Sequence, residues 1–240
     1  MAISKISSEA APGFPRDAFD RVQVAVRTTQ AGAHPLAASL RTEITAASLA
    51  VVYRHRQAWE SGEGLLELAQ QQRSERGTDW HFAAQTAVFG FYVSLLSSFE
   101  STFYALYFAG AQLSPEEFPF IKDDKTHRSI GPASAAKAFT QAWPDDRLSL
   151  KLAEVSSSYI HKDSHLAKTR NILAHRVAPG FEHRVMLLGE DLADAKEVNY
   201  ELAWGGRPVE QLIPETLAEA ESVLGSLWEA AADFLDRRAI

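Results

Sequence analysis

A chain of 240 residues with 46% hydrophobic residues is long enough to bury a substantial apolar core in one large domain. It contains no cysteine, which excludes disulfide frameworks, thiolate metal sites and cysteine nucleophiles. A formal charge of −7 excludes a surface that is basic throughout, as unspecific binding of nucleic acid would require.

The start of the chain and its most apolar stretch indicate where in the cell we expect the protein. Residues 1–16 lack the basic start and the continuous apolar run of a secretory signal, so we expect a cytoplasmic protein. Residues 80–110 carry a single charge, Glu100, and are long enough to span a bilayer. Polar side chains interrupt this stretch, and no cluster of Lys or Arg flanks it. We therefore expect a buried core helix and no association with a membrane.

Helical periodicity begins early in the chain. Residues 1–15 show none, so we expect them to be disordered or frayed. One helix is predicted directly after them and a second after Pro35, from the spacing of apolar residues. Gly62 and Gly64 are expected to break or bend the second helix, and a separate short helix is predicted over 65–75.

The middle of the chain predicts the core of the fold. A long helix over 79–109 is apolar nearly all round, so other helices must surround it, and Gly110 is its expected stop. A short helix is predicted over 133–143. Pro144 is expected to open the next one, because a proline at the first helical position loses no hydrogen bond. A further helix over 164–176 carries the candidate site.

The last part of the chain predicts a hairpin and a helix. Residues 184–188 and 197–203 have the composition of two short strands. Gly205 and Gly206 predict a turn, and Pro214 is the expected start of a final amphipathic helix.

The segment 170–176, which reads RNILAHR, is the best candidate for a working site. On a helix, Asn171 and His175 lie one turn apart on the same face, and the long side chain of Arg170 reaches round to it. A titratable imidazole, a permanent cation and an amide are thereby brought together. The structural alternative is a helix end stabilised by its cations, which oppose the negative end of the helix dipole.

Arg170, Asn171 and His175 resemble the signature of the HEPN superfamily (higher eukaryotes and prokaryotes nucleotide-binding), in which an Arg and a polar residue precede a His by a few positions. The order of the elements that precede the signature is similar too. The predicted long helix with Glu100 at its middle resembles the family's leading helix, which often carries an acid near the active site. The resemblance covers about residues 79–179.

The resemblance implies an all-α protein, a helical bundle of HEPN type, here with a small appended β-hairpin. We expect a frayed segment over 1–15 and a single helical domain over 16–240. Within this domain, a HEPN-like core over 79–179 would be followed by the hairpin at 184–203 and the C-terminal helix at 214–238.

The function that the resemblance implies is that of a metal-independent endoribonuclease of a toxin–antitoxin or phage-defence system, needing no cofactor. His175 would act as acid or base, Arg170 would stabilise the transition state, and Asn171 and Glu100 would orient them. Family members commonly pair, so we expect a homodimer whose two copies share one cleft. The alternative is a non-catalytic HEPN-like protein that binds a nucleotide, RNA or a protein partner.

Residues 161–184 contain five Lys or Arg against two acids, and four of the eight histidines. The structural alternative for this cluster is a solvated helix face. As RNA-binding residues we predict Lys162, His165, Lys168 and Arg176. The four-residue spacing of two histidines here, 161 and 165, permits zinc binding from one helix face, but no third ligand is marked, so we expect no metal.

The resemblance also bears on protein partners. An antitoxin is one candidate, and a nucleotidyltransferase is another, because in one subgroup such an enzyme modifies a Tyr two residues after the His. Val177 occupies that position here, which argues against this modification.

Overall fold

The computed structural model describes residues 6–28, 37–71, 78–119, 129–175, 182–188 and 197–238. In chain order its elements are η1 (Ile6–Glu9), α1 (Arg16–Thr28), α2 (Ala37–Gln70), α3 (Thr78–Leu113), α5 (Pro132–Ala142), α6 (Arg147–Glu154), the π-helical turn η3 (Val155–Tyr159), α7 (His165–His175), β1 (Glu182–Leu188), β2 (Glu197–Trp204), β3 (Arg207–Pro208) and α8 (Val209–Asp236). The predicted all-α class with a small hairpin is confirmed.

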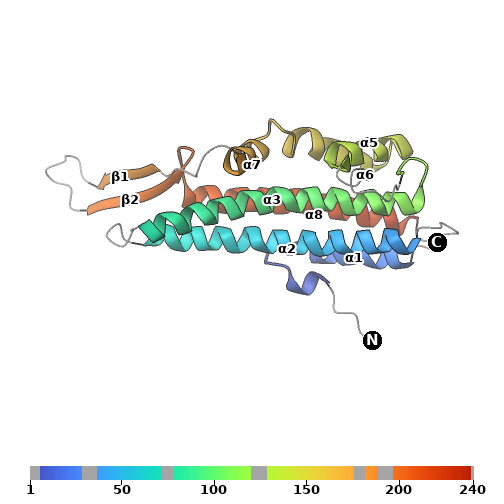
Figure 1. Ribbon diagram of the computed structural model, residues 1–240, viewed down its shortest axis with the longest axis horizontal. Coiled ribbons are helices and arrows are strands. Elements are labelled where there is room, and N and C mark those ends of the chain that lie inside the picture. Colours follow the sequence, from blue (N-terminus) through green and yellow to red (C-terminus); the bar gives the residue numbers. More distant parts are fainter. Residues whose placement is uncertain are drawn as a thin grey trace.

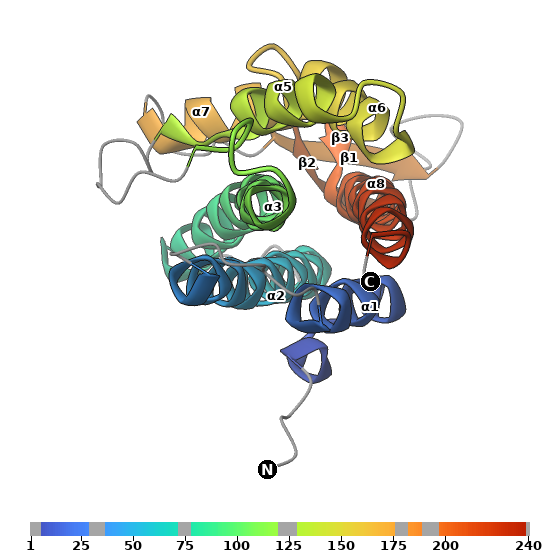
Figure 2. The ribbon, with the colours of Figure 1, turned by 90° about the vertical axis from the view of Figure 1, so that its right-hand side faces the viewer.

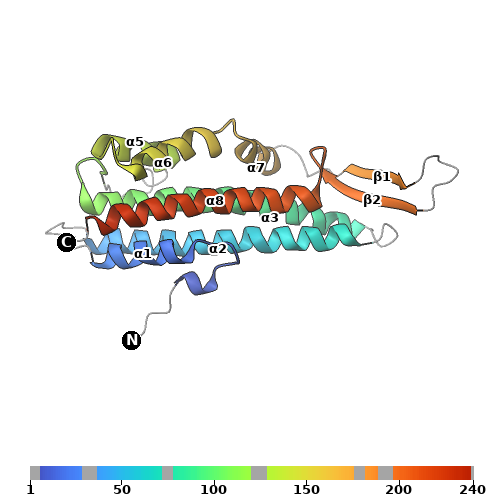
Figure 3. The same cartoon turned by 180° about the vertical axis from the view of Figure 1, so that it is seen from behind.

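The helices α1, α2, α3 and α8 form the elongated body of the molecule. α2 and α3 lie side by side, α1 packs on α8, and α8 contacts both α2 and α3 (Figure 1). The opposite side, with α8 and α1 in front, is seen in Figure 3. α5, α6 and α7 form a further layer over α3 and α8 (Figure 2). α3 is therefore covered from several sides.

α3 lies at the centre of the core because its apolar residues occupy most of its circumference. Phe91, Phe99 and Phe103 are completely buried. Within the described part of the chain, the segment Asp79–Leu113 is the one helix whose length and composition would allow it to cross a membrane. Its packing against α2, α5, α7 and α8 is that of a core helix.

The strands form an antiparallel sheet in the order β1-β2-β3, which extends beyond one end of the bundle (Figure 1). The two strands expected from the sequence are confirmed, and Ala203 and Trp204 pair with the additional short strand β3. Gly205 and Gly206 join β2 to β3 with positive φ angles of 56° and 77°. Two-residue hairpin turns need this backbone conformation, which glycine adopts without strain.

The glycines expected to interrupt helices do not do so. α2 continues through Gly62 and Gly64, and no separate helix begins at residue 65. α3 likewise continues through Gly110 to Leu113. Close packing accounts for two of these glycines: a Cβ at position 62 would lie 2.9 Å from Ile213, and one at position 110 would lie 2.6 Å from Phe118. These glycines let neighbouring elements approach rather than ending the helix.

Gly62→Ala is expected to lower the free energy of unfolding by about 1 kcal/mol, because overpacking against Ile213 and Phe91 outweighs the better helix propensity of alanine. Gly64→Ala is the matched control. It lies in the same helix with nothing within 4 Å of its added Cβ, so it is expected to raise stability by about 0.5–1 kcal/mol. Urea denaturation measures both values, and equal stability of the two variants would contradict the close approach at Gly62.

Two helices do not begin at the prolines that were expected to start them. α6 begins at Arg147 rather than at Pro144, because the side chain of Asp146 caps it by accepting from the Leu148 N–H at 2.9 Å. α8 begins at Val209, so Pro214 lies inside it. Burial of Val209, Leu212 and Ile213 supports this added first turn despite the hydrogen bond that the proline cannot donate.

The expectation of a frayed start is wrong for residues 6–15. The turn η1 leads into a segment whose Phe14 is buried, with its ring centroid 5.2 Å from those of Phe19 and His55. Arg16 donates back to the Ala10 carbonyl at 2.5 Å. η1 packs against α2 and α1, and residues 1–5 lie outside the described residues.

Candidate functional site

The predicted site lies on α7, which is a helix as expected. The hydroxyl of Ser164 accepts from the Ala167 N–H at 3.2 Å and so caps its first turn. Leu166, Ala167 and Leu173 are buried, and α7 packs against α3 through this side of the helix. Packing therefore holds the segment in a fixed position beside the middle of α3.

Arg170 reaches α3 from this helix and contacts Glu100. Its Nη2 donates to Glu100 Oε1 at 2.8 Å, and the side chains are 27% and 41% exposed, respectively. The predicted contact of Glu100 with the candidate site is thereby confirmed. A partly exposed ion pair stabilises a fold by only about 0–1 kcal/mol. Its main effect is to hold one edge of the guanidinium while leaving N–H donors for another group.

The other two residues of the signature, Asn171 and His175, have fewer described contacts than Arg170. Asn171 follows Arg170 and is half-buried, and the neighbouring Ile172 is 46% exposed. His175 is the last residue of α7, but its side chain lies outside the described set. Its approach to Arg170 or Asn171 remains a prediction.

The predicted RNA-binding residues are distributed around the start of α7. Lys162, His165 and Lys168 are exposed, whereas Arg176 lies outside the described residues. The ring of His165 meets Tyr92 edge-on, with centroids 6.3 Å apart. This contact anchors the imidazole on α3 and leaves it accessible to solvent.

The helical zinc geometry considered for His161 and His165 is not formed. His161 precedes α7, and its Nδ1 lies 3.6 Å from a carboxylate oxygen of Asp163. In the part of the chain that the structure describes, no three His, Asp or Glu side chains are grouped so that they would hold a metal ion.

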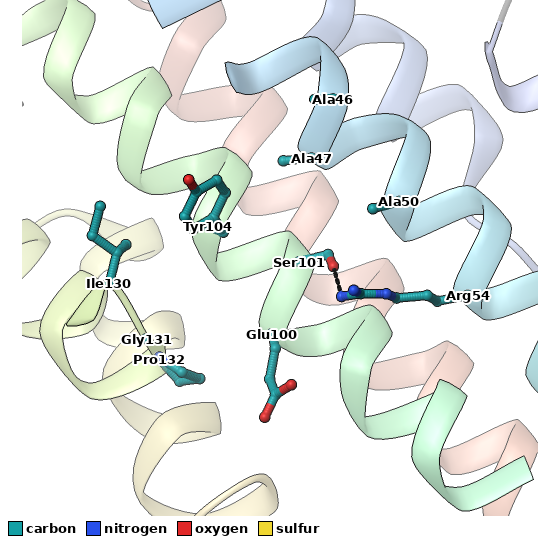
Figure 4. Close-up of a pocket in the computed structure, with 10 residues that line it drawn as sticks. All are labelled: Ala46, Ala47, Ala50, Arg54, Glu100, Ser101, Tyr104, Ile130, Gly131 and Pro132. Carbon is teal, nitrogen blue, oxygen red and sulfur yellow. Dashed lines mark hydrogen bonds between the residues drawn. The ribbon is translucent and has the colours of Figure 1, made fainter. Parts of the chain in front are cut away.

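A groove of about 530 Å³ adjoins the Arg170–Glu100 pair. Figure 4 shows Glu100 at one end of it, with α2 on one side and the start of α5 on the other. Glu100 thus belongs to both the signature site and the groove. The groove is lined by Ala46, Ala47, Ala50, Arg54, Glu100, Ser101, Tyr104, Ile130, Gly131 and Pro132.

Arg54, Ser101 and Tyr104 are the polar side chains of the groove that sequence reasoning missed. Arg54 Nη1 donates to the Ser97 carbonyl at 3.1 Å and to the Ser101 hydroxyl. Tyr104 donates to Glu43 at 3.3 Å. Burial, reinforced by the Glu43 charge, raises the pKa of Tyr104 to about 12. Its phenol therefore stays protonated at neutral pH and is unsuited to act as a base.

Comparison with known proteins gives no match to this chain among family models, curated proteins or solved structures.

Proposed function

We propose that this chain is a HEPN-type, metal-independent endoribonuclease. The observation that carries the proposal is the Arg170–Glu100 contact, which joins the signature helix to the acidic residue of the long apolar helix. The resemblance implies an acidic residue of the long helix near the active site, and this contact agrees with that expectation. A role in a toxin–antitoxin or phage-defence system is consistent with such an activity.

The chemistry needs one group to move protons and another to stabilise charge. His175 removes the proton of a ribose 2′-hydroxyl, whose oxygen then attacks the adjacent phosphorus. The bond to the 5′-oxygen breaks, and this oxygen receives a proton from His175 or from the same residue of a second copy. Arg170 donates to the phosphoryl oxygens as negative charge develops on them. Glu100 and Asn171 orient these groups.

Exposed apolar side chains favour a second copy as the partner at this site. Phe82 and Phe89 are 71% and 42% exposed and lie on the same face of α3 as Glu100, because their spacings correspond to whole helical turns. Ile172 on α7 is exposed as well. Apolar residues exposed beside a polar site are typical of an interaction surface. A symmetric pairing there would bring two copies of the motif together.

Light scattering at micromolar concentration is expected to give twice the 26.4 kDa mass of one chain. The double variant Phe82→Ser, Phe89→Ser should shift the protein toward the monomer, because it removes the apolar part of the interface. Leu150→Ser is the matched control, since Leu150 is 61% exposed but lies on α6. A wild-type protein that stays monomeric would contradict both the interface and a composite site.

A non-catalytic HEPN-like protein that binds a nucleotide, RNA or a protein partner is the second candidate. The formal charge of −7 favours it, and so does the carboxylate already bound to Arg170. Such a protein would bind its ligand without breaking any bond.

Incubation of the purified protein with single-stranded RNA in the presence of EDTA tests the proposal. Cleavage should proceed and leave a 2′,3′-cyclic phosphate and a 5′-hydroxyl, because ribose supplies the nucleophile. DNA of the same sequence is the matched control, since it lacks the 2′-hydroxyl. The catalytic proposal is wrong if the RNA stays intact or if the DNA is cut equally well, and RNA that is bound but intact supports the second candidate.

A further inference from the structure

Apart from Glu100, the side chains that line the groove take no part in the proposed cleavage step. The groove's volume of about 530 Å³ falls within the usual range of small-molecule sites. Alanine side chains of α2 leave open space on one side, and the ring of Tyr104 stands between them and the start of α5 (Figure 4). A flat group can therefore enter beside an aromatic ring.

Arg54 gives this groove a fixed positive charge. Both N–H groups of its Nη1 are used, one by the Ser97 carbonyl and one by the Ser101 hydroxyl. A guanidinium has five N–H donors, so three remain on Nε and Nη2. No carboxylate among the residues that the structure describes forms an ion pair with Arg54. Within the described part of the chain, the cation is thus held in place by neutral acceptors and not by a carboxylate.

The acids near the groove are already engaged. Glu100 accepts from Arg170, and Glu43 accepts from the Tyr104 hydroxyl. Arg170 thus partly offsets the charge of Glu100, whereas the neutral phenol leaves Glu43 charged, and Arg54 is the cation among the described lining residues that an anion would meet. A metal ion is a poor occupant, because Glu100 is the only carboxylate among the described residues that line the groove.

We propose that the groove binds one nucleotide of single-stranded RNA next to the cleaved bond. The base lies against the Tyr104 ring and the alanines of α2, and the phosphate receives hydrogen bonds from Arg54. The inference rests on the proposed function, because RNA is taken as the ligand of the Arg170 site. A base and a phosphate match this combination, since stacking on an aromatic ring tolerates any base and a guanidinium binds phosphate in a planar geometry.

The test measures binding separately from cleavage. The probe is a fluorescent 2′-O-methyl RNA oligonucleotide, which lacks the free 2′-hydroxyl and cannot be cut by this chemistry. Fluorescence anisotropy should show that Tyr104→Leu raises the Kd about 10-fold, as expected for the loss of one stacked base, whereas Tyr104→Phe keeps the affinity. Arg54→Gln should weaken binding and reduce the salt dependence of the Kd by about one phosphate contact.

Matched controls lie close by on α2. Arg56→Gln removes a cation that is exposed and paired with Glu60, and Tyr53→Leu removes an aromatic ring that is 67% exposed. Neither residue lines the groove, so both variants should bind like the wild type. Ala50→Leu fills the groove without altering Tyr104 or Arg54, and it should weaken binding even if Tyr104→Leu fails to fold.

The outcomes separate the nucleotide site from the catalytic proposal. If the groove variants weaken binding and the controls do not, the nucleotide site stands, even in a protein that cleaves no RNA. If all folded variants, including Ala50→Leu, bind like the wild type, the nucleotide site is wrong, whether or not RNA is cleaved. A wild-type protein that does not bind the oligonucleotide also overturns it.

Discussion

His175→Ala and Arg170→Ala are each expected to lower the rate of RNA cleavage by about 100-fold or more, which is the usual effect of removing an acid–base group or a donor that stabilises the transition state. Because the substrate still binds elsewhere, the loss should appear in kcat more than in KM. The rate of wild-type cleavage in EDTA is the reference, measured with a single-stranded RNA of mixed sequence.

The fold should survive both substitutions. Arg170 is partly exposed, and its partner Glu100 is 41% exposed, so that removing the cation leaves the carboxylate in contact with water rather than unpaired in the core. His161→Ala is the matched control for the histidine, because His161 is exposed and precedes α7. Circular dichroism and melting curves show whether each variant is folded.

Two results would contradict the catalytic roles. Variants that are folded and cleave RNA as fast as the wild type would show that Arg170 and His175 take no part in the chemistry. Variants that unfold would show that the two residues stabilise the end of α7, as cations at a helix C-terminus do. Loss of activity in the His161→Ala control would indicate a general effect of altering this surface.

The sequence predicted helices most accurately where a long apolar pattern fits only a buried helix. α3 is covered by other helices over most of its circumference, as its apolar pattern predicted. The Arg170–Glu100 contact was predicted from the cost of leaving a carboxylate without a partner in such a helix, but Glu100 is 41% exposed, so that cost is smaller than expected. Errors arose where the role of a residue depends on its neighbours in space. Gly62 breaks no helix, because Ile213, far away in the sequence, packs against it.

The residues that line the groove could not be predicted from apolar periodicity. Tyr104 lies one turn after Glu100 on α3, so extending that face would have included it. Arg54 lies in another helix and carries no spacing signal that relates it to Glu100. Its role depends on two acceptors, Ser97 and Ser101, that only the packing of α2 on α3 brings within reach. Local periodicity cannot supply such a contact.

His55, on α2, is a buried titratable residue that bears on the stability of the fold. His55 is 0% exposed, and within the described structure neither of its ring nitrogens has a hydrogen-bond partner. Its Nε2 lies 3.7 Å from Glu221 Oε1 on α8, and the ring of Phe14 covers it. Burial lowers the pKa of His55 to about 4, because the charged imidazolium is desolvated there.

The protein is therefore expected to lose about 3 kcal/mol of stability between pH 6.5 and pH 4 through His55 alone. In this range the unfolded chain binds a proton at His55 and the folded protein does not, so the free energy of unfolding falls as the pH falls. Burial raises the pKa of Glu221, which has the opposite effect, because the folded protein then holds the proton more tightly. His55 has the larger shift and sets the sign.

His55→Leu should flatten the dependence of stability on pH, and at neutral pH it should leave stability unchanged or higher, since it replaces two nitrogens without partners by an apolar group. Between pH 7 and pH 4.5, the melting temperature of the wild type should fall by about 5–10 °C more than that of the variant. Glu221→Gln should steepen the dependence of stability on pH, because it removes both the opposing titration and the carboxylate nearest to a charged His55.

Parallel curves for the wild type and His55→Leu would show that His55 does not cause the acid sensitivity. A shallower curve for Glu221→Gln would show that the pair is charged at neutral pH, in which case the sign assigned to His55 is wrong.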